Sequence, residues 1–129
     1  MRINRNKILA FFGTGVLATV ASLLIGLEDA QDTPYKDSVG ITTVCVGSTA
    51  NGPAKAPIDK SKVYTAKECA DRLRADLTPT YDAVRKLVKI PVSDLETAAY
   101  TSLTFNIGIT AFSNSTLLKL LNSGDRVRA

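Results

Sequence analysis

The chain contains no histidine among its 129 residues, and it has only two cysteines. Without histidine it can form neither a Ser-His nor a Cys-His catalytic pair, and it lacks a frequent ligand of zinc sites. We therefore expect no metal and no cofactor. At this length the chain has room for one folded domain at most.

The chain also lacks a cluster of basic residues interleaved with aromatic ones. Its net charge of +4 depends on Arg2, Arg5 and Lys7, and setting these aside leaves 13 Lys and Arg against 12 Asp and Glu. The basic bias therefore belongs to the first few residues, and the remainder is nearly neutral. This distribution argues against nucleic-acid binding.

Charge is absent altogether from Ile8 to Leu27, a run of 20 residues. As a helix, 20 residues span about 30 Å, which is the thickness of a bilayer core. The basic residues before the run should stay on the cytoplasmic side, so the rest of the chain would face outward. The sequence therefore predicts a transmembrane or signal-anchor segment over residues 1–27 and a domain over residues 28–129 that faces the periplasm.

This run is unusual for a permanent anchor because it contains many small and hydroxyl residues: Gly13, Thr14, Gly15, Thr19, Ser22 and Gly26. Such residues weaken insertion, so the segment could leave the membrane. Three alternatives stay open. The run could be an ordinary signal peptide cut after Ala21, a permanent anchor, or a helix whose small residues pack against another membrane helix.

The two cysteines, Cys45 and Cys69, both lie on the predicted outward side. In an oxidising compartment they could form a disulfide closing a loop of about 25 residues, worth roughly 3 kcal/mol. The alternative is a pair of buried free thiols, because free cysteine behaves as a small hydrophobic residue. We favour the disulfide.

Strand patterns are confined to the region just after the apolar run. Residues 29–34 are polar and end in a turn signal, whereas residues 35–49 are β-branched and broken by glycine, which predicts one or two short hairpins. Residues 50–62, with two prolines and three lysines, are expected to form a surface loop.

Helix patterns fill the second half of the chain. Thr65 and Glu68 form a predicted capping box that opens a helix with an apolar stripe, and Pro79 should kink or restart it. Ser93 and Glu96 predict a second capping box. A small β element followed by helices indicates an α+β fold.

The helix predicted over residues 94–107 is apolar nearly all round, which is typical of a buried helix. Gly108 should end it. A further short helix should begin at Ser113 or Ser115 and run through Leu121.

Two carboxyl groups stand out for acid–base chemistry. Glu28 lies next to Leu27 and close to Ile25, where loss of water contact would keep its carboxyl protonated. Asp37 lies in a polar turn between Lys36 and Ser38, where it should stay ionised. Hydrolysis of a glycosidic bond needs one protonated carboxyl and one carboxylate.

The spacing of these residues resembles a known family. Glu28, eight residues, Asp37, five residues and Thr43 resemble the catalytic triad of the phage T4-type lysozymes, glycoside hydrolase family 24. Agreement continues through Pro34-Tyr35-Lys36-Asp37, Thr43-Val44-Cys45, the residues around Thr65 and those from Phe105 to Leu118. With its Gly- and Ala-rich start, the chain is most similar to the signal-anchor-release endolysins of lambdoid phages.

The resemblance implies a lysozyme-like fold with a small β-hairpin lobe and a helical lobe. Glu28 would be the general acid, Asp37 would activate the attacking water, and Thr43 would hold that water in an inverting reaction. Phe105 and Ser115 would line the sugar-binding cleft. Alternatives stay open for three residues: Phe105 could be core packing, Ser115 a helix cap, and Glu28 a charge that merely ends a membrane span.

Two departures from the family have expected consequences. The family has a histidine after the hairpin glycine, paired with an aspartate that matches Asp76, and this chain has Ser48 there. We expect this loss to cost stability more than chemistry. The family also continues through further helices after Gly124-Asp125. Without them the 94–107 helix would be exposed and the lobe destabilised.

Three functional hypotheses follow. The first is an active muramidase that cleaves between N-acetylmuramic acid and N-acetylglucosamine in peptidoglycan and so lyses the host. The second is a truncated, inactive remnant that only anchors or binds the wall. The third is a membrane module that associates with partner proteins. We expect a monomer in the host inner membrane, facing the periplasm and possibly released into it.

Overall fold

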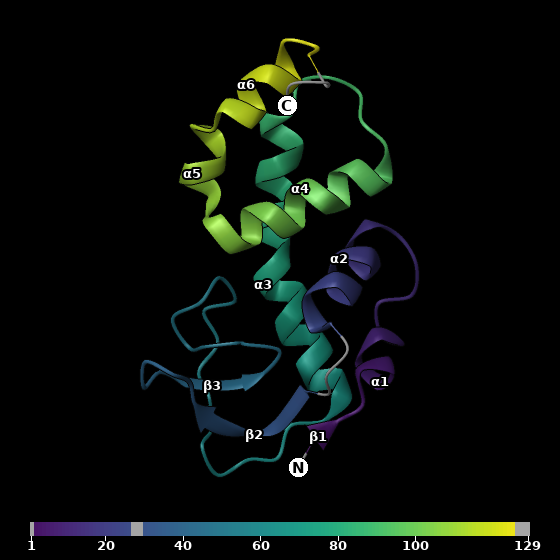
Figure 1. Ribbon diagram of the computed structural model, residues 1–129. Helices are drawn as coiled ribbons and strands as arrows, with labels where there is room; N and C mark the ends of the chain where they lie inside the picture. Colours follow the sequence, from purple (N-terminus) through teal and green to yellow (C-terminus); the bar gives the residue numbers. More distant parts are fainter. Residues whose placement is uncertain (1, 27–29, 126–129) are drawn as a thin grey trace.

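The computed structural model describes residues 2–26 and 30–125 and shows a sheet at one end, a group of helices at the other, and a long helix joining them (Figure 1). The fold is α+β, as predicted. The elements in chain order are β1 (Arg2–Ile3), α1 (Arg5–Leu9), α2 (Val16–Ile25), β2 (Ala30–Lys36), β3 (Thr42–Cys45), α3 (Ala66–Leu87), α4 (Asp94–Ile107), α5 (Ile109–Ser113) and α6 (Thr116–Asn122).

The sheet is antiparallel in the order β1-β2-β3. Its hairpin, β2 and β3, agrees with the prediction for residues 35–49, but β2 begins at Ala30 within the stretch expected to be a polar turn. The reason is tertiary pairing. Arg2 and Ile3 lie opposite Gln31 and Ala30, so the start of the chain supplies a third strand that no local pattern indicates.

The apolar run does not form one continuous helix in this structure, which differs from the expectation for residues 8–27. Two helices, α1 and α2, are separated by a turn in which Gly13 has φ 66° and Gly15 has φ 104°. These left-handed values favour glycine and break a helix. Within residues 2–26 and 30–125, no helix combines the length and the apolar character needed to cross a membrane.

The two N-terminal helices pack into the same hydrophobic core as the sheet and α3. Ile8, Val20 and Ala21 are fully buried in it. The Nη2 of Arg74, on α3, donates to the carbonyl of Phe11 across 2.9 Å, and its guanidinium lies 4.6 Å from the ring of Phe12. In this state residues 2–26 are therefore part of the folded body.

Helix α3 runs along the molecule between its two ends (Figure 1). It begins with the predicted capping box, in which Thr65 and Glu68 each accept a backbone N–H from the other. The predicted restart at Pro79 is wrong, because one helix continues through it to Leu87. Proline removes only one N–H donor, and buried side chains hold the helix on both sides of it: Leu77 packs in the main core and Val84 in a second, smaller core.

Helix α4 begins and ends where the sequence predicts, with a Ser93–Glu96 capping box and with Gly108 at φ 95°. Its burial is one-sided: Ala98, Thr101 and Thr104 are buried. The large apolar side chains on its other sides are exposed: Leu95, Leu103 and Ile107. The helix is therefore buried on one side only, which differs from the expectation of a buried helix.

The end of the helical part is formed by α5 and α6 (Figure 1). Phe112 is fully buried against Val84 and Leu118, which makes a second, smaller core. The ring of Tyr100 lies 6.5 Å from that of Phe112. This core attaches the short terminal helices to the far end of α3.

Candidate active site

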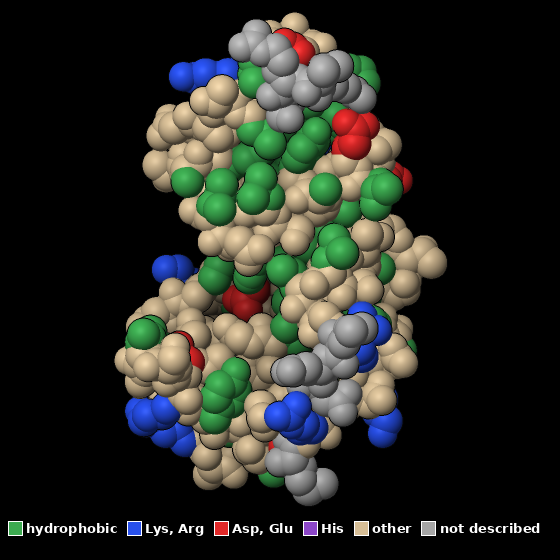
Figure 2. Space-filling view, in the orientation of Figure 1, with side chains coloured by type: hydrophobic (Ala, Val, Ile, Leu, Met, Phe, Trp, Pro, Cys, Tyr) green, Lys and Arg blue, Asp and Glu red, His purple; other side chains and the backbone are tan. Residues whose placement is uncertain are grey.

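The predicted acid, Glu28, lies outside the described residues. Ile25 and Ala30, on either side of it, both line a pocket of about 410 Å³. The pocket lies where α2, the hairpin, α3 and α4 meet, and Figure 2 shows the surface hollowed at the waist between the sheet end and the helical end. The lining residues are Leu24, Ile25, Ala30, Cys45, Val46, Gly47, Leu73, Phe105 and Asn106.

Asp37 lies in the turn between β2 and β3. Its Oδ1 accepts from the backbone N–H of Val39 at 3.0 Å and from that of Ile41 at 2.9 Å. The backbone N–H of Asp37 donates to the carbonyl of Ile41 at 3.0 Å, and its carbonyl accepts from Gly40 at 3.0 Å. Backbone N–H groups of the same turn therefore hold the Asp37 carboxylate in place.

Thr43 is nearly completely buried, although its side chain is polar. It lies opposite Tyr35 in the β2–β3 pairing, and its Oγ1 donates to the carbonyl of Ile41 at 2.9 Å. The hairpin therefore brings Asp37 and Thr43 together through one shared residue, Ile41. The five residues between them, 38–42, comprise most of this turn and the first residue of β3.

The two predicted sugar-contacting residues have different surroundings. Phe105 lines the pocket, as expected for a sugar contact, and it also packs against the main core, as expected for a core residue. Ser115 is the N-cap of α6, where its Oγ accepts from Leu118 at 3.1 Å and donates to the carbonyl of Phe112 at 2.7 Å. Its hydroxyl is thus engaged in the helix cap.

A buried polar cluster surrounds Ser48, the position at which the resemblance leads one to expect a histidine. The Nε of Arg72 donates to the Oγ of Ser48 at 2.9 Å, and the guanidinium also donates to the carbonyls of Pro57 at 3.1 Å and Ala56 at 2.9 Å. Asp76, also buried, accepts from the N–H of Ala54 at 2.9 Å. The Ser48 hydroxyl is therefore hydrogen-bonded to the guanidinium of Arg72, a residue of α3.

The carboxyl of Asp76 is in an unfavourable place for a charge. Burial raises its pKa above the ordinary value of 3.8, and the N–H of Ala54, the hydroxyl of Ser48 and the charge of Arg72 offset this only in part. The cluster ties the loop over residues 50–62 to α3. Through Ser48, which follows the hairpin, it also stabilises the wall of the site.

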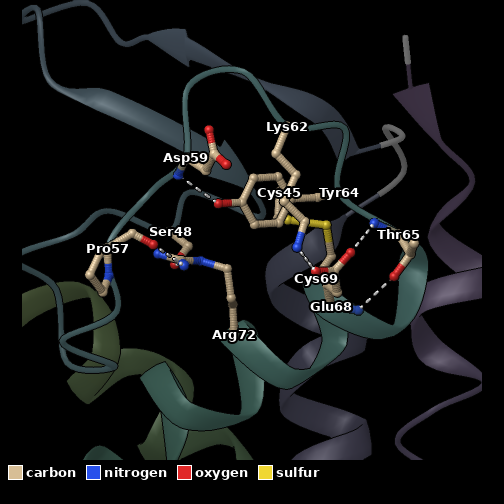
Figure 3. Close-up of a disulfide and its surroundings, with 10 residues drawn as sticks. All are labelled: Cys45, Ser48, Pro57, Asp59, Lys62, Tyr64, Thr65, Glu68, Cys69 and Arg72. Carbon is tan, nitrogen blue, oxygen red and sulfur yellow. Dashed lines mark hydrogen bonds and ion pairs between the residues drawn. A yellow bond between two sulfur atoms is a disulfide. The ribbon is translucent and has the colours of Figure 1, made fainter.

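Cys45 and Cys69, predicted as a pair, are joined by a disulfide with a Cα–Cα distance of 5.2 Å (Figure 3). It connects the end of β3 to the first turn of α3, and both residues are buried. The ring of Tyr64 lies beside it, with the guanidinium of Arg72 5.9 Å away. Because Cys45 also lines the pocket, the disulfide fixes part of the pocket wall.

Lys62 and Glu68 form an ion pair near this disulfide (Figure 3). The Lys62 hydrogen bond lowers the pKa of Glu68, and the N–H of Thr65 acts in the same direction. Both side chains are partly exposed to solvent. The pair belongs to the start of α3, so it supports the scaffold.

Sequence reasoning missed two residues that shape the site, Ile41 and Arg72. Ile41 acts through its backbone N–H and carbonyl, so the identity of its side chain gives no indication of this role. Arg72 occupies the apolar side of an amphipathic helix, three positions after Cys69 and four before Asp76. A charged residue at a core position of a helix is the signal that could have identified it.

Comparison with known proteins gives a consistent result. The family model of phage lysozyme matches residues 26–129. The SAR-endolysin of Escherichia phage Mu is 43% identical over 102 residues, covering 79% of this chain and 56% of that protein. The SAR-endolysin of Enterobacteria phage P21 is 36% identical over 94% of this chain and 74% of its own length.

Solved structures of phage endolysins and lysozymes are also similar to this chain. The endolysin from Escherichia coli O157:H7 phage FAHEc1 superimposes with a TM-score of 0.71 at 34% identity, over 87% of this chain and 67% of that one. A point mutant of P22 lysozyme gives 0.67 at 30% identity, over 97% and 76%. The chain thus spans between about half and three quarters of the length of these proteins. With the family model matching most of its length, the chain belongs to the phage lysozyme family.

Proposed function

We propose that the protein is an endolysin that hydrolyses the β-1,4 bond between N-acetylmuramic acid and N-acetylglucosamine in peptidoglycan, for host cell lysis. The observation that carries this proposal is the pocket between the hairpin and α4. Residues on both sides of Glu28 line it, and the adjacent hairpin holds Asp37 and Thr43 on one shared residue. The endolysin names of several relatives support the same activity.

The roles of the three residues follow from what the reaction requires. Glu28 donates a proton to the leaving glycosidic oxygen, and Asp37 accepts a proton from the attacking water. Ile25, three residues before Glu28, is buried and lines the pocket, which supports an apolar environment that keeps an acid protonated. Thr43 holds the water beside Asp37. Its present bond to the carbonyl of Ile41 orients its hydroxyl oxygen.

Two further residues belong to this proposal as sugar contacts. Phe105 offers an apolar ring at the pocket wall, where a sugar ring or an acetyl methyl group can pack. Ser115 is the weaker of the two candidates, because its hydroxyl is already hydrogen-bonded within the cap of α6. The effect of Phe105→Ala on KM should therefore exceed that of Ser115→Ala.

We further propose that residues 8–27 first hold the chain in the host inner membrane and then leave it. The uncharged run of 20 residues and the SAR-endolysin names of the relatives support this. The packing of α1 and α2 in the core gives the released segment a place in the fold. The membrane-held form would be inactive, since α2 is then missing from the pocket wall.

The activity is tested by loss of turbidity of permeabilised Gram-negative cells. We expect clearing by the wild type and none by Glu28→Gln. Glu96→Gln is the matched control, because glutamine can retain its capping box. If wild type and Glu28→Gln clear cells equally, or if neither clears them, the enzyme proposal is wrong for this chain.

The bond is tested by mass spectrometry of the released glycan after borohydride reduction. Cleavage at the proposed bond leaves N-acetylmuramic acid at the reducing end, and thus its reduced form in the products. Reduced N-acetylglucosamine would instead show a different specificity.

A further inference from the structure

We propose that Gly40 is a positioning residue, which sets the turn through which the Ile41 backbone holds the Asp37 carboxylate and the Thr43 hydroxyl in one arrangement. The inference rests on the proposed roles of Asp37 and Thr43. Neither Gly40 nor Ile41 has a side-chain function in that proposal, so their contribution is a separate property of the fold.

The backbone groups of Ile41 make three hydrogen bonds to the two proposed catalytic residues. Its N–H donates to Oδ1 of Asp37 at 2.9 Å, and its carbonyl accepts both the N–H of Asp37 at 3.0 Å and the Oγ1 of Thr43 at 2.9 Å. A displacement of this one residue therefore moves both catalytic side chains. The Ile41 side chain is about half exposed, so the connection is made by the backbone.

The Asp37 carboxylate is held asymmetrically by this turn. The N–H groups of Val39 and Ile41 both donate to Oδ1, so the second oxygen, Oδ2, makes neither of these contacts. Two amide bonds to one oxygen fix the rotation of the carboxyl group. Fixed orientation is what a general base needs to meet its water in the productive geometry.

Gly40 makes this turn possible because its φ is 85°, in the left-handed region that favours glycine. Its own N–H donates to the carbonyl of Asp37 at 3.0 Å. A Cβ built on Gly40 meets nothing within 4 Å. Alanine at this position would therefore cause no clash, and its effect would come only from the backbone conformation.

The structure supplies a matched control for this conformational effect. Gly124, after α6, has φ 86°, and a Cβ there also meets nothing within 4 Å. Gly40→Ala and Gly124→Ala thus each place a Cβ at nearly the same positive φ, one beside the proposed site and one far from it. Gly40→Asn is the conservative rescue, because asparagine tolerates the left-handed region better than alanine.

The experiment measures kcat, KM and thermal unfolding of the full chain on solubilised glycan strands. We expect Gly40→Ala to lower kcat at least about tenfold with KM within about twofold, since misplacement affects the transition state. Gly124→Ala should lower the unfolding temperature by a similar amount and leave kcat within about twofold. Gly40→Asn should recover most of the lost kcat.

Equal kcat values for Gly40→Ala and Gly124→Ala would overturn the inference, as would a loss confined to KM. Amide hydrogen exchange separates this failure from that of the proposed function. We expect the amides of Val39 and Ile41 to be protected in the wild type and to exchange at least about tenfold faster in Asp37→Ala and Gly40→Ala. If the chain proves inactive, unchanged exchange in these variants overturns the positioning role independently.

Discussion

The Nε of Arg72 donates to the Oγ of Ser48 across 2.9 Å and so joins α3 to the residue that follows the hairpin glycine. This cation satisfies Ser48 and two loop carbonyls at once and lies within the electrostatic range of buried Asp76. Ser48 is thus part of a buried polar network that contains no histidine.

Replacing Arg72 by methionine should destabilise the protein by about 2–4 kcal/mol. The change removes three hydrogen bonds and leaves the Asp76 carboxylate buried without a nearby cation. Urea unfolding at pH 7 measures the loss. Lys86→Met, on the exposed side of the same helix, is the control and should stay within about 0.5 kcal/mol of the wild type. Similar losses in both variants would show that the cluster does not stabilise the fold.

Asp76 should give the stability of the wild type a pH dependence that Asp76→Asn lacks. Because burial raises the folded-state pKa above 3.8, the folded protein retains a proton that the unfolded chain releases. The free energy of unfolding, relative to Asp76→Asn, should thus be highest below about pH 3.8 and fall as the pH rises through the folded-state pKa. Urea midpoints of both proteins, measured from acid to neutral pH, give this difference. A difference that stays constant, or grows with pH, would contradict the assignment.

Reducing the Cys45–Cys69 disulfide should lower the free energy of unfolding by roughly 3 kcal/mol, because the bond joins residues 24 positions apart. Thermal unfolding with and without dithiothreitol measures the change. A variant with alanine at both positions is the control and should be insensitive to the reductant. An unchanged wild-type transition after confirmed loss of the disulfide would refute the expected stabilisation.

Leucine at both Gly13 and Gly15 should retain the protein in membranes and delay lysis. The change makes the run more apolar, and it also strains the fold described here, in which these positions have φ 66° and 104°. The measurements are the protein content of the membrane fraction and the time of lysis. Thr19→Leu adds apolar surface at a helical position, so its delay should be smaller. Unchanged lysis timing in the double variant would refute release as the trigger.

The parts of the fold that were predictable are those set by local chemistry. Examples are the Thr65 and Ser93 capping boxes and the end of α4 at Gly108. The start of α6 at Ser115 is one of the two starting points that the sequence predicts. The β1–β2 pairing was not predictable, because its partners are far apart in the sequence. The helix through Pro79 was missed since tertiary packing outweighed one lost hydrogen bond.

In the candidate site, too, some features could be predicted from the sequence and others depend on the folded chain. The spacing of Glu28, Asp37 and Thr43 was visible in the sequence, and the turn explains the interval between the last two. The backbone role of Ile41 became visible only in the folded chain. The apolar run was visible, but its place in the core was not, because its composition also fits a bilayer.

The pairing of Arg2 with Gln31 also limits when the fold can be completed. Antiparallel partners lie about 5 Å apart between Cα atoms, whereas a chain spanning a bilayer through residues 8–27 keeps the same two residues on opposite sides of about 30 Å of hydrocarbon. The two arrangements exclude each other. In the proposed release from the membrane, β1 can therefore pair with β2 only after the charged start of the chain has crossed to the side of the hairpin.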